Sequence, residues 1–505
     1  KDFRMKKNFR KLVITLVCMV LAITTFAMNS TKSIYATNDD QKLRSVFSID
    51  AGRKYFSEEQ LIRIVEKAYK NGYTDVQILL GNDALRLFLD DMSLSVNGKN
   101  YASDDVKAAL TKGNSEYYND PNGNALTQAE IERVLAYAKS KGMNIIPVIN
   151  TPGHMDSILV AMEELGISNP AFQGSKRTVD VTNKEAVDFA QALVKKYVDF
   201  FSEYCEIFNF GCDEYANDVN SGGWQKLQDQ GFYDEFIAYV NGLAKIIKDA
   251  NMLPMCFNDG IYYNSNDSFG TFDKDIIISY WIAGWWGYDV AKPEYLVEKG
   301  HKILNTNDGW YWVLGNYNYE EHNNPYFYEK TVTNINSKKF TEVAGAKGEI
   351  PIIGSMQCVW SDYPEATYEE DVVFELMDLF SSKHSDYLIR PADYTKVEEA
   401  LAKIPADLSI YTDESVNALI AAKDAVVYNL DISKQAEVDA MAKAINDAIA
   451  NLKLKEVNNP SDSNNPETTK PETAPATGDV TNMYFFVTTA MAAGALAVLL
   501  RKKRA

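Results

Sequence analysis

Short apolar runs alternate with amphipathic segments along the middle of this 505-residue chain. Eight runs have the length and composition of buried strands: 46–50, 75–81, 144–150, 206–211, 254–259, 275–281, 302–307 and 352–360. Apolar residues at helical spacing lie between several of them. Repeated strand–helix units predict parallel strands, and eight units favour a closed (β/α)₈ barrel over residues 45–395. An open doubly wound sheet is the alternative, although no G-x-G-x-x-G follows the first run.

The pattern changes after the predicted barrel. Residues 396–455 are rich in alanine with apolar residues at helical spacing, which predicts a small all-α helical bundle. This segment resembles the short helical modules of Gram-positive surface proteins. Its role stays open between contact with sugar or cell wall and service as a spacer or barrel support. Residues 456–477 are polar and contain several prolines, which predicts a disordered linker.

Hydrophobic segments lie near both ends of the chain. Residues 1–36 show the order of basic, apolar and small residues that is typical of a secretory signal peptide, with residues 1–4 upstream of the expected start. A permanent membrane anchor is the alternative for this segment. Residues 483–500 are apolar apart from two threonines, which is long enough to span a bilayer, and the basic tail 501–505 closes the chain.

The pentapeptide APATG at 474–478 resembles the LPxTG sorting signal of Gram-positive wall proteins, with Ala474 in place of leucine. The resemblance implies that a wall-sorting transpeptidase cuts between Thr477 and Gly478 and joins the chain to peptidoglycan. A plain transmembrane anchor is the alternative. In both cases we expect a secreted protein, attached to the Gram-positive cell wall or held by its C-terminal segment, with the folded part facing outside.

Composition narrows the class of partner. A net charge of −19 argues against nucleic acid, because a phosphate backbone requires a basic face. Four cysteines remain outside the signal segment: Cys205, Cys212, Cys256 and Cys358. Their apolar settings predict buried free thiols, and their irregular spacing is not that of a metal site. We expect no metal and no cofactor.

Polar or aromatic residues follow every predicted strand. In a (β/α)₈ barrel, chemistry gathers at the C-terminal strand ends. The residues at these ends are Arg53, Asp83, Asn150 to His154, Asp213 with Glu214, Asn258 with Asp259, Trp281, Asp308 to Tyr311, and Trp360 with Asp362. Six of the seven tryptophans lie between 281 and 360, and such a cluster suits the binding of a sugar.

Two acidic residues, Asp213 and Glu214, stand side by side just after the run 206–211. Neighbours on a strand point to opposite faces, so both reach one pocket only where the strand has ended, and Gly211 eases that turn. Two carboxylates in a water-poor pocket split their pKa values, one staying ionised and one protonated. Glycoside cleavage requires such an acid and such an anion. An ordinary acidic loop is the alternative.

Seven ordered motifs resemble those of family 20 glycoside hydrolases: SIDAGRKYFS, LLGNDALRLFLDDMS, NTPGHMDSILVAM, FNFGCDEYANDVN, FNDGIYY, SYWIAGWWGY and VWSDYP. They are most similar to the catalytic modules of streptococcal surface β-N-acetylhexosaminidases. The resemblance covers 45–395 and implies a (β/α)₈ fold with exo-acting, retaining hydrolysis. The expected substrate is a glycan with terminal β-linked N-acetylglucosamine, and N-acetylgalactosamine is left open. A lacto-N-biosidase and a non-catalytic glycan-binding adhesin are the alternatives.

The resemblance also assigns roles around the acetamido group. In this family the 2-acetamido oxygen of the substrate attacks its own anomeric carbon, so the enzyme supplies no nucleophile. Glu214 would be the general acid and later the base, while Asp213 would orient the acetamido N–H and stabilise the intermediate. Tyr311 would donate a hydrogen bond to the acetamido oxygen. Trp281 and Trp360 would form walls around that group.

The remaining candidates bind the sugar or support the acid. Asp83 and His154 would form a relay behind Glu214. Further substrate-binding candidates are Arg53, Asp362, Asn150 and Trp310. Asn150 stands where many relatives have Asp, and Asp362 stands where many have Glu. Both departures leave the expected chemistry intact and change contacts around the pocket.

Overall fold

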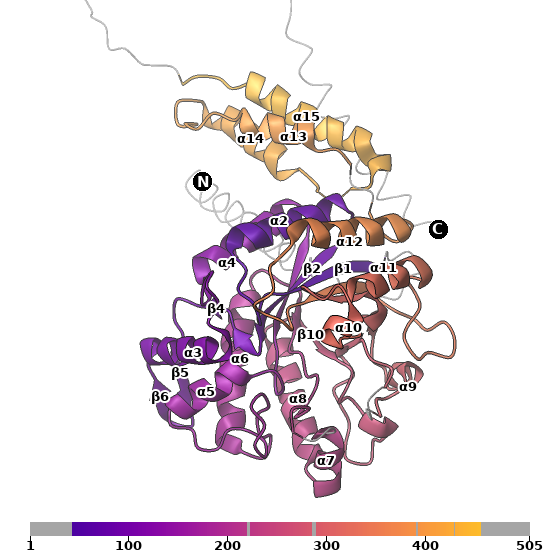
Figure 1. Ribbon diagram of the computed structural model, residues 1–505. Helices are drawn as coiled ribbons and strands as arrows, with labels where there is room; N and C mark the ends of the chain where they lie inside the picture. Colours follow the sequence, from indigo (N-terminus) through magenta and orange to yellow (C-terminus); the bar gives the residue numbers. More distant parts are fainter. Residues whose placement is uncertain (1–42, 220–222, 285–288, 390–391, 429, 456–505) are drawn as a thin grey trace, which may run out of the picture. The chain divides into compact units, whose positions relative to one another are not determined.

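Eight parallel strands close into a barrel in the computed structural model, which describes residues 43–219, 223–284, 289–389, 392–428 and 430–455 (Figure 1). They are β1 (Arg44–Asp50), β2 (Asp75–Asn82), β8 (Asn144–Ile149), β9 (Ile207–Asn209), β10 (Leu253–Phe257), β11 (Ile277–Tyr280), β12 (Ile303–Asn305) and β14 (Gly354–Trp360). Because β1 pairs with both β2 and β14, the sheet is closed. Each strand overlaps a predicted run, so the barrel prediction is confirmed and the open sheet is wrong.

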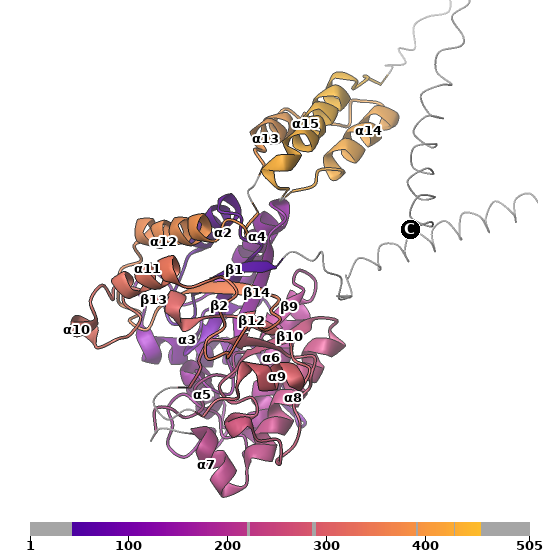
Figure 2. The ribbon, with the colours of Figure 1, turned by 90° about the vertical axis from the view of Figure 1, so that its right-hand side faces the viewer.

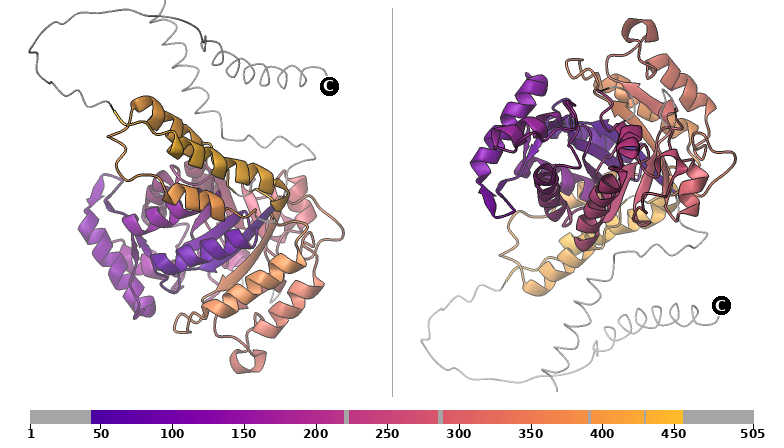
Figure 3. Two further views of the ribbon diagram at one scale, coloured as in Figure 1. Left: turned by 90° about the horizontal axis from the view of Figure 1, so that it is seen from above. Right: turned by 90° about the horizontal axis from the view of Figure 1, so that it is seen from below.

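Helices surround the strands, as the views along the vertical axis show (Figure 3). They are α2 (Glu58–Lys70), α4 (Gln128–Ser140), α6 (Lys184–Phe201), α8 (Tyr233–Asp249), α9 (Pro293–Glu298), α11 (Tyr328–Ser337) and α12 (Glu370–Lys383). Ser57 and Thr127 start α2 and α4 with capping boxes, which satisfy free N–H groups at the helix start. In the described stretch 258–276, the only helical element is η1 (Tyr263–Ser265), so the fifth unit departs from the (β/α)₈ repeat.

Excursions at the C-terminal strand ends add further elements. They are β3 (Ala84–Leu85), β4 (Leu87–Phe88), β5 (Leu94–Val96), β6 (Lys99–Tyr101), α3 (Ser103–Tyr118), β7 (Leu126–Thr127), α5 (Asp156–Glu164), α7 (Gly223–Gln230), η2 (Asp308–Trp310), β13 (Tyr311–Val313) and α10 (Tyr319–His322). The short strand β13 pairs with the end of β14. This pairing fixes the loops after β12 against the barrel mouth.

The helices α13 (Thr395–Ala402), α14 (Asp413–Asp424) and α15 (Gln435–Ala450) follow the barrel, with η3 (Ile432–Lys434) before α15 (Figure 2). Val438, Ala442 and Ile445 form the buried face of α15. The expected helices are therefore present. The described residues up to Lys453 fall into one compact unit, and the boundary at residue 395 stays a prediction.

The segments predicted to target and anchor the chain lie outside the described residues: 1–36, 456–477, the motif 474–478, 483–500 and 501–505. These predictions therefore stay predictions. Within the described ranges, no helix combines the length and the apolar character needed to cross a membrane.

Candidate active site

A pocket opens at the C-terminal mouth of the barrel. It is lined by Arg53, Asp213, Glu214, Phe257, Trp281, Tyr311, Tyr326, Trp360 and Asp362. All of these except Phe257 and Tyr326 were candidates from the sequence. Apolar side chains such as Val46 and Ile146 fill the barrel interior, and the same cluster continues into Trp281 and Tyr311. The core of the barrel thus forms the floor of the pocket.

Asp213 and Glu214 both line this pocket because the chain turns sharply after β9. Gly211, Cys212 and Glu214 have φ values of 70°, 71° and 51°, in the left-handed region that side chains rarely adopt. A Cβ atom on Gly211 would lie 1.9 Å from Oδ1 of Asn150, so only glycine fits there. The turn brings two neighbouring carboxylates to one site, as the sequence predicted.

Asn150 fixes the position of Asp213 by hydrogen bonds. Its Nδ2 donates to Asp213 Oδ1 at 2.7 Å, and its Oδ1 accepts from the Cys212 N–H at 3.1 Å. Burial opposes ionisation of Asp213, but the charge of His154 and hydrogen bonds from His154 and Asn150 lower its pKa. Asn150 is 1% exposed and does not line the pocket. The expectation that it binds substrate is therefore corrected: it positions Asp213.

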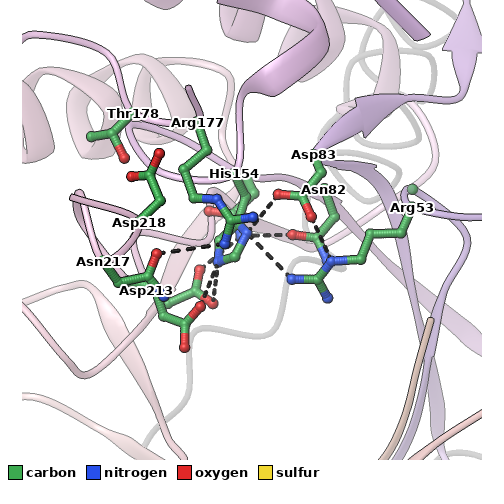
Figure 4. Close-up of polar contacts among 12 residues, drawn as sticks. Arg53, Asn82, Asp83, His154, Arg177, Thr178, Asp213, Asn217 and Asp218 are labelled. Atoms are coloured by element: carbon green, nitrogen blue, oxygen red, sulfur yellow. Dashed lines mark hydrogen bonds and ion pairs between the residues drawn. The ribbon is translucent and has the colours of Figure 1, made fainter. Parts of the chain in front are cut away.

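His154 joins the buried Asp83 to the two pocket carboxylates (Figure 4). Its Nδ1 lies 2.8 Å from Asp83 Oδ1, while its Nε2 lies 3.2 Å from Glu214 Oε2 and 3.5 Å from Asp213 Oδ2. Burial opposes the charge on His154, yet Asp213 and Asp83 raise its pKa well above the ordinary value. The imidazole is thus held protonated between carboxylates. The structure brings together the three residues expected to form a relay.

Arg53 completes the charged network. Its Nε donates to Asp83 Oδ2 at 2.6 Å, and its Nη1 donates to Asp50 at 3.0 Å and to Asp362 at 3.2 Å. Burial opposes ionisation of Asp83, but Arg53 and His154 hold the pKa of that carboxyl well below its usual range. We call Arg53, Asp83, His154 and Asp213 the charged side of the pocket.

Four aromatic residues, Trp281, Tyr311, Tyr326 and Trp360, form what we call the aromatic side. Trp281 stacks on Tyr311 with ring centroids 6.1 Å apart and an interplanar angle of 15°. Trp360 and Tyr326 each meet Tyr311 edge-on, at 5.4 Å. No nitrogen or oxygen of the described residues hydrogen-bonds the Tyr311 hydroxyl, whose polar neighbour is the Cys358 thiol. The aromatic side thus encloses an apolar space, and the Tyr311 hydroxyl is a hydrogen-bond donor within it.

Asp259 connects the general-acid candidate to the aromatic side. Its Oδ1 accepts from Trp281 Nε1 at 2.5 Å, and its Oδ2 accepts from the Glu214 N–H at 3.1 Å. Its neighbour Asn258 accepts from the Trp281 N–H at 2.9 Å through Oδ1. Burial raises the pKa of Asp259, although both hydrogen bonds oppose that shift. The end of β10 therefore fixes the separation between Glu214 and Trp281.

Trp310 does not reach the pocket. It is fully buried, and its ring packs against Phe380 and His384 of the α12 region. Its neighbour Tyr311 begins β13, where the chain leaves η2, and lines the pocket. The expectation that Trp310 binds substrate is corrected: it anchors η2 to the helix layer.

Three residues near the site were missed: Phe257, Tyr326 and Arg177. Phe257 is the last residue of β10, and an apolar residue there gives no signal of a pocket. Arg177 lies beside His154 (Figure 4), and its Nη1 donates to Asn217 Oδ1 at 3.5 Å. The carboxylates of Asp83 and Asp156 raise the pKa of Arg177 against the effect of burial. It adds positive charge near Glu214.

Groups that hold metals are not found within the described ranges, where no cluster of three or more His, Cys, Asp or Glu has suitable geometry. The four cysteines of this part of the chain are free and buried, as expected.

Comparison with known proteins agrees with this geometry. A model of the glycosyl hydrolase family 20 catalytic domain matches residues 44–375, so the chain belongs to this family. Its catalytic domain is a glycoside hydrolase of the β-N-acetylhexosaminidase type.

Two kinds of relatives give more detail. A solved structure from work on the catalytic modules of the pneumococcal exo-β-D-N-acetylglucosaminidase StrH is 49% identical, covers 81% of this chain and 98% of that one, and has a TM-score of 0.71. The lacto-N-biosidase of Bifidobacterium bifidum is 27% identical over 252 residues, which are 47% of this chain and 21% of that protein. Beta-hexosaminidase subunit A2 of Dictyostelium discoideum is 28% identical over 158 residues, 30% of this chain and 28% of that protein. The match thus spans less than a third of either curated relative.

Proposed function

We propose that the chain is an exo-β-N-acetylglucosaminidase that removes terminal β-linked N-acetylglucosamine from glycans with retention of configuration. One observation carries the proposal: Asp213 and the adjacent Glu214 face an aromatic box that contains the Tyr311 hydroxyl. The lowered pKa of Asp213 favours its ionised form there. An acetamido group has a polar N–H, a polar oxygen and an apolar methyl, and this pocket offers a partner for each. The likeness to the pneumococcal module supports glucosamine as the sugar.

In the first step, Glu214 donates its proton to the glycosidic oxygen as the bond from that oxygen to C1 breaks. The acetamido oxygen of the substrate forms the new bond to C1, which gives a cyclic oxazolinium ion. Asp213 accepts the acetamido N–H and balances the positive charge, while Tyr311 donates to the acetamido oxygen. In the second step, the Glu214 carboxylate takes a proton from water, whose oxygen attacks C1 from the same face as the departed group. The bond from C1 to the acetamido oxygen breaks, which restores the acetamido group and leaves Glu214 protonated.

The charged side supports both steps. His154 Nε2 lies 3.2 Å from Glu214 Oε2, so the imidazolium stabilises the carboxylate that remains after proton donation. Asp83 keeps His154 charged and oriented. Arg53 and Asp362 are ion-paired at the pocket edge, where they are suited to hydrogen-bond the hydroxyls of the sugar.

Location is a separate proposal. We infer that the chain is secreted and attached to the cell wall of a Gram-positive bacterium, with a sorting transpeptidase and peptidoglycan as partners. The segments 1–36, 474–478 and 483–500 support this, as described from the sequence. Release of the protein from isolated walls by a muramidase, but not by detergent, is the expected result. Release by detergent alone would instead indicate a membrane anchor.

The activity is tested with an aryl β-N-acetylglucosaminide, the matching β-N-acetylgalactosaminide and the matching β-glucoside. We expect rapid cleavage of the acetamido substrates and none of the glucoside, since the glucoside lacks the internal nucleophile. Equal cleavage of both classes would contradict substrate assistance. The ratio of the cleavage rates of the glucosaminide and the galactosaminide shows how strongly the enzyme discriminates between the two orientations of the 4-hydroxyl.

A lacto-N-biosidase is the second candidate because one curated relative carries that activity over 252 aligned residues. Cleavage of an aryl lacto-N-bioside, with release of an intact disaccharide and no action on the monosaccharide substrates, would favour it. Binding of N-acetylglucosamine without any turnover would favour the adhesin.

A further inference from the structure

Tyr326 presents a buried hydroxyl at the pocket wall, and nothing in the sequence pattern indicated it. The residue lines the pocket, and its ring meets Tyr311 edge-on at 5.4 Å and 61°. Its hydroxyl is buried and has no hydrogen-bond partner among the described residues. A buried hydroxyl without a partner is unfavourable, because it has lost its hydrogen bonds to water. Such a cost is typical of a group that a ligand is meant to satisfy.

The position of Tyr326 is built by the surrounding backbone. Its carbonyl accepts from the Val313 N–H at 3.0 Å, and its own N–H donates to Asn324 Oδ1 at 2.8 Å. Two residues later, the Tyr328 N–H donates to the Asn316 carbonyl at 3.0 Å. The loop before α11 is thus tied at Tyr326 to the end of β13 and at Tyr328 to Asn316, in the turn that follows β13. The ring is held in place before any ligand arrives.

Tyr326 shares these properties with two other groups on the aromatic side. The Tyr311 hydroxyl and Trp360 Nε1 are also buried donors of the same pocket without a nitrogen or oxygen partner in the described chain. The acetamido group accounts for Tyr311, since it has one oxygen. A second tyrosine donor therefore matches a different oxygen of the sugar. Burial raises the pKa of Tyr326, and Asp308, Glu214 and Asp362 add to the shift, so the hydroxyl keeps its proton.

We propose that the Tyr326 hydroxyl donates a hydrogen bond to the 4- or 6-hydroxyl oxygen of the bound N-acetylhexosamine, on the Asp362 side of the pocket. Tyr326 is then a specificity-determining residue that acts separately from the acetamido box. The inference rests on the proposed function and adds to it a contact with the sugar ring.

The substitution Tyr326→Phe removes only the hydroxyl. We expect kcat/KM for the aryl N-acetylglucosaminide to fall 10- to 100-fold, while the melting temperature stays unchanged or rises because an unpaired buried group is gone. Tyr368→Phe is the matched control, since Tyr368 also buries a hydroxyl without a partner in the described chain but does not line the pocket. It should leave kcat/KM unchanged. A value for Tyr326→Phe within twofold of the wild type would overturn the proposal.

Deoxy substrates locate the contact. Tyr326→Phe should no longer lower kcat/KM, relative to the wild type, when the substrate lacks the accepting oxygen. That substrate is either the 4-deoxy or the 6-deoxy aryl N-acetylglucosaminide. An equal penalty with both would overturn the assignment. If the wild type cleaves no acetamido substrate, the proposed function fails on its own. Calorimetric binding of N-acetylglucosamine to the wild type and to Tyr326→Phe then gives the same comparison, with equal affinities contradicting the contact.

Discussion

The two sides of the pocket differ in how their polar groups are satisfied. On the charged side, Arg53, Asp83, His154 and Asp213 join in one network of ion pairs and hydrogen bonds. On the aromatic side, the rings pack closely but leave the donors of Tyr311, Tyr326 and Trp360 without nitrogen or oxygen partners in the described chain. The side proposed to handle the proton is satisfied by its own residues. The side proposed to recognise the sugar keeps these donors for the oxygens of a ligand.

Removing the proposed acid should have the largest effect on turnover. Glu214 contacts His154 on the charged side and is linked through Asp259 to Trp281 on the aromatic side. Glu214→Gln keeps the shape but has no proton to give, so we expect turnover of the aryl N-acetylglucosaminide to fall about 10³-fold. Binding of N-acetylglucosamine, measured by calorimetry, should change little. Glu203→Gln is the control, since Glu203 is exposed on a loop away from the pocket. Turnover above a tenth of the wild-type value would contradict the role of Glu214.

Breaking the charged side should cost both activity and stability. His154→Gln leaves Asp83 and Asp213 without the imidazolium charge between them, so we expect unfolding to require about 3 kcal/mol less free energy. We expect kcat to fall about 100-fold, because the Glu214 carboxylate loses its support. Denaturant unfolding and steady-state kinetics measure the two effects. Loss of activity at full stability would show that the network is not a structural unit.

The same histidine should make stability depend on pH. The pKa of His154 is raised in the folded state, so its contribution is complete below the ordinary value of about 6.5 and is lost as pH rises toward the folded value, by at most about 1.4 kcal/mol per pH unit. The excess stability of wild type over His154→Gln should therefore shrink above that pH in thermal melts.

His301 provides the opposite case. Burial lowers the pKa of His301, which accordingly favours folding at high pH and loses that contribution as pH falls below about 6.5. The difference between wild type and His301→Gln should thus have the reverse slope. Parallel slopes for the two variants would contradict the assignment of a charged His154.

Loosening the link between the two sides should have the smallest effect. Asp259→Asn retains one acceptor for the Trp281 and Glu214 N–H donors, and Trp281→Phe removes one of those donors. We expect each to lower kcat/KM about tenfold, with the double variant little worse than either single one because both changes break one connection. Fully additive losses in this double-mutant cycle would show that Asp259 does not act through Trp281.

Much of the barrel could be predicted because buried parallel strands leave near-continuous apolar runs in the sequence. The acidic pair and its position after β9 were also predicted, since two adjacent charges just after an apolar run that ends in Gly211 are unusual. The stretch 258–276 was less predictable. Its Tyr, Asn and Phe residues form turns and η1 rather than a helix, and no spacing signal separates these outcomes.

The contacts of individual side chains were harder to predict. Trp310 and Tyr311 are neighbours of similar chemistry, and only the start of β13 decides which one enters the pocket. Asn150 sits in a motif near the site, but its direction depends on the turn at Gly211 in another strand–loop unit. Tyr326 comes from an irregular loop and is one of 30 tyrosines, so it gave no signal at all.

The left-handed backbone at the site has a consequence for engineering. Asp83, His154 and Glu214 have φ values of 58°, 52° and 51°, and each such non-glycine residue costs of the order of 1–3 kcal/mol. Glycine would relax the turn at Glu214, whose side chain is partly exposed, whereas replacement of Asp83 or His154 would also break the buried ion pair between them. Selection for heat resistance alone would therefore favour replacement of Glu214, the proposed acid. Directed evolution of this scaffold should select for turnover in every round.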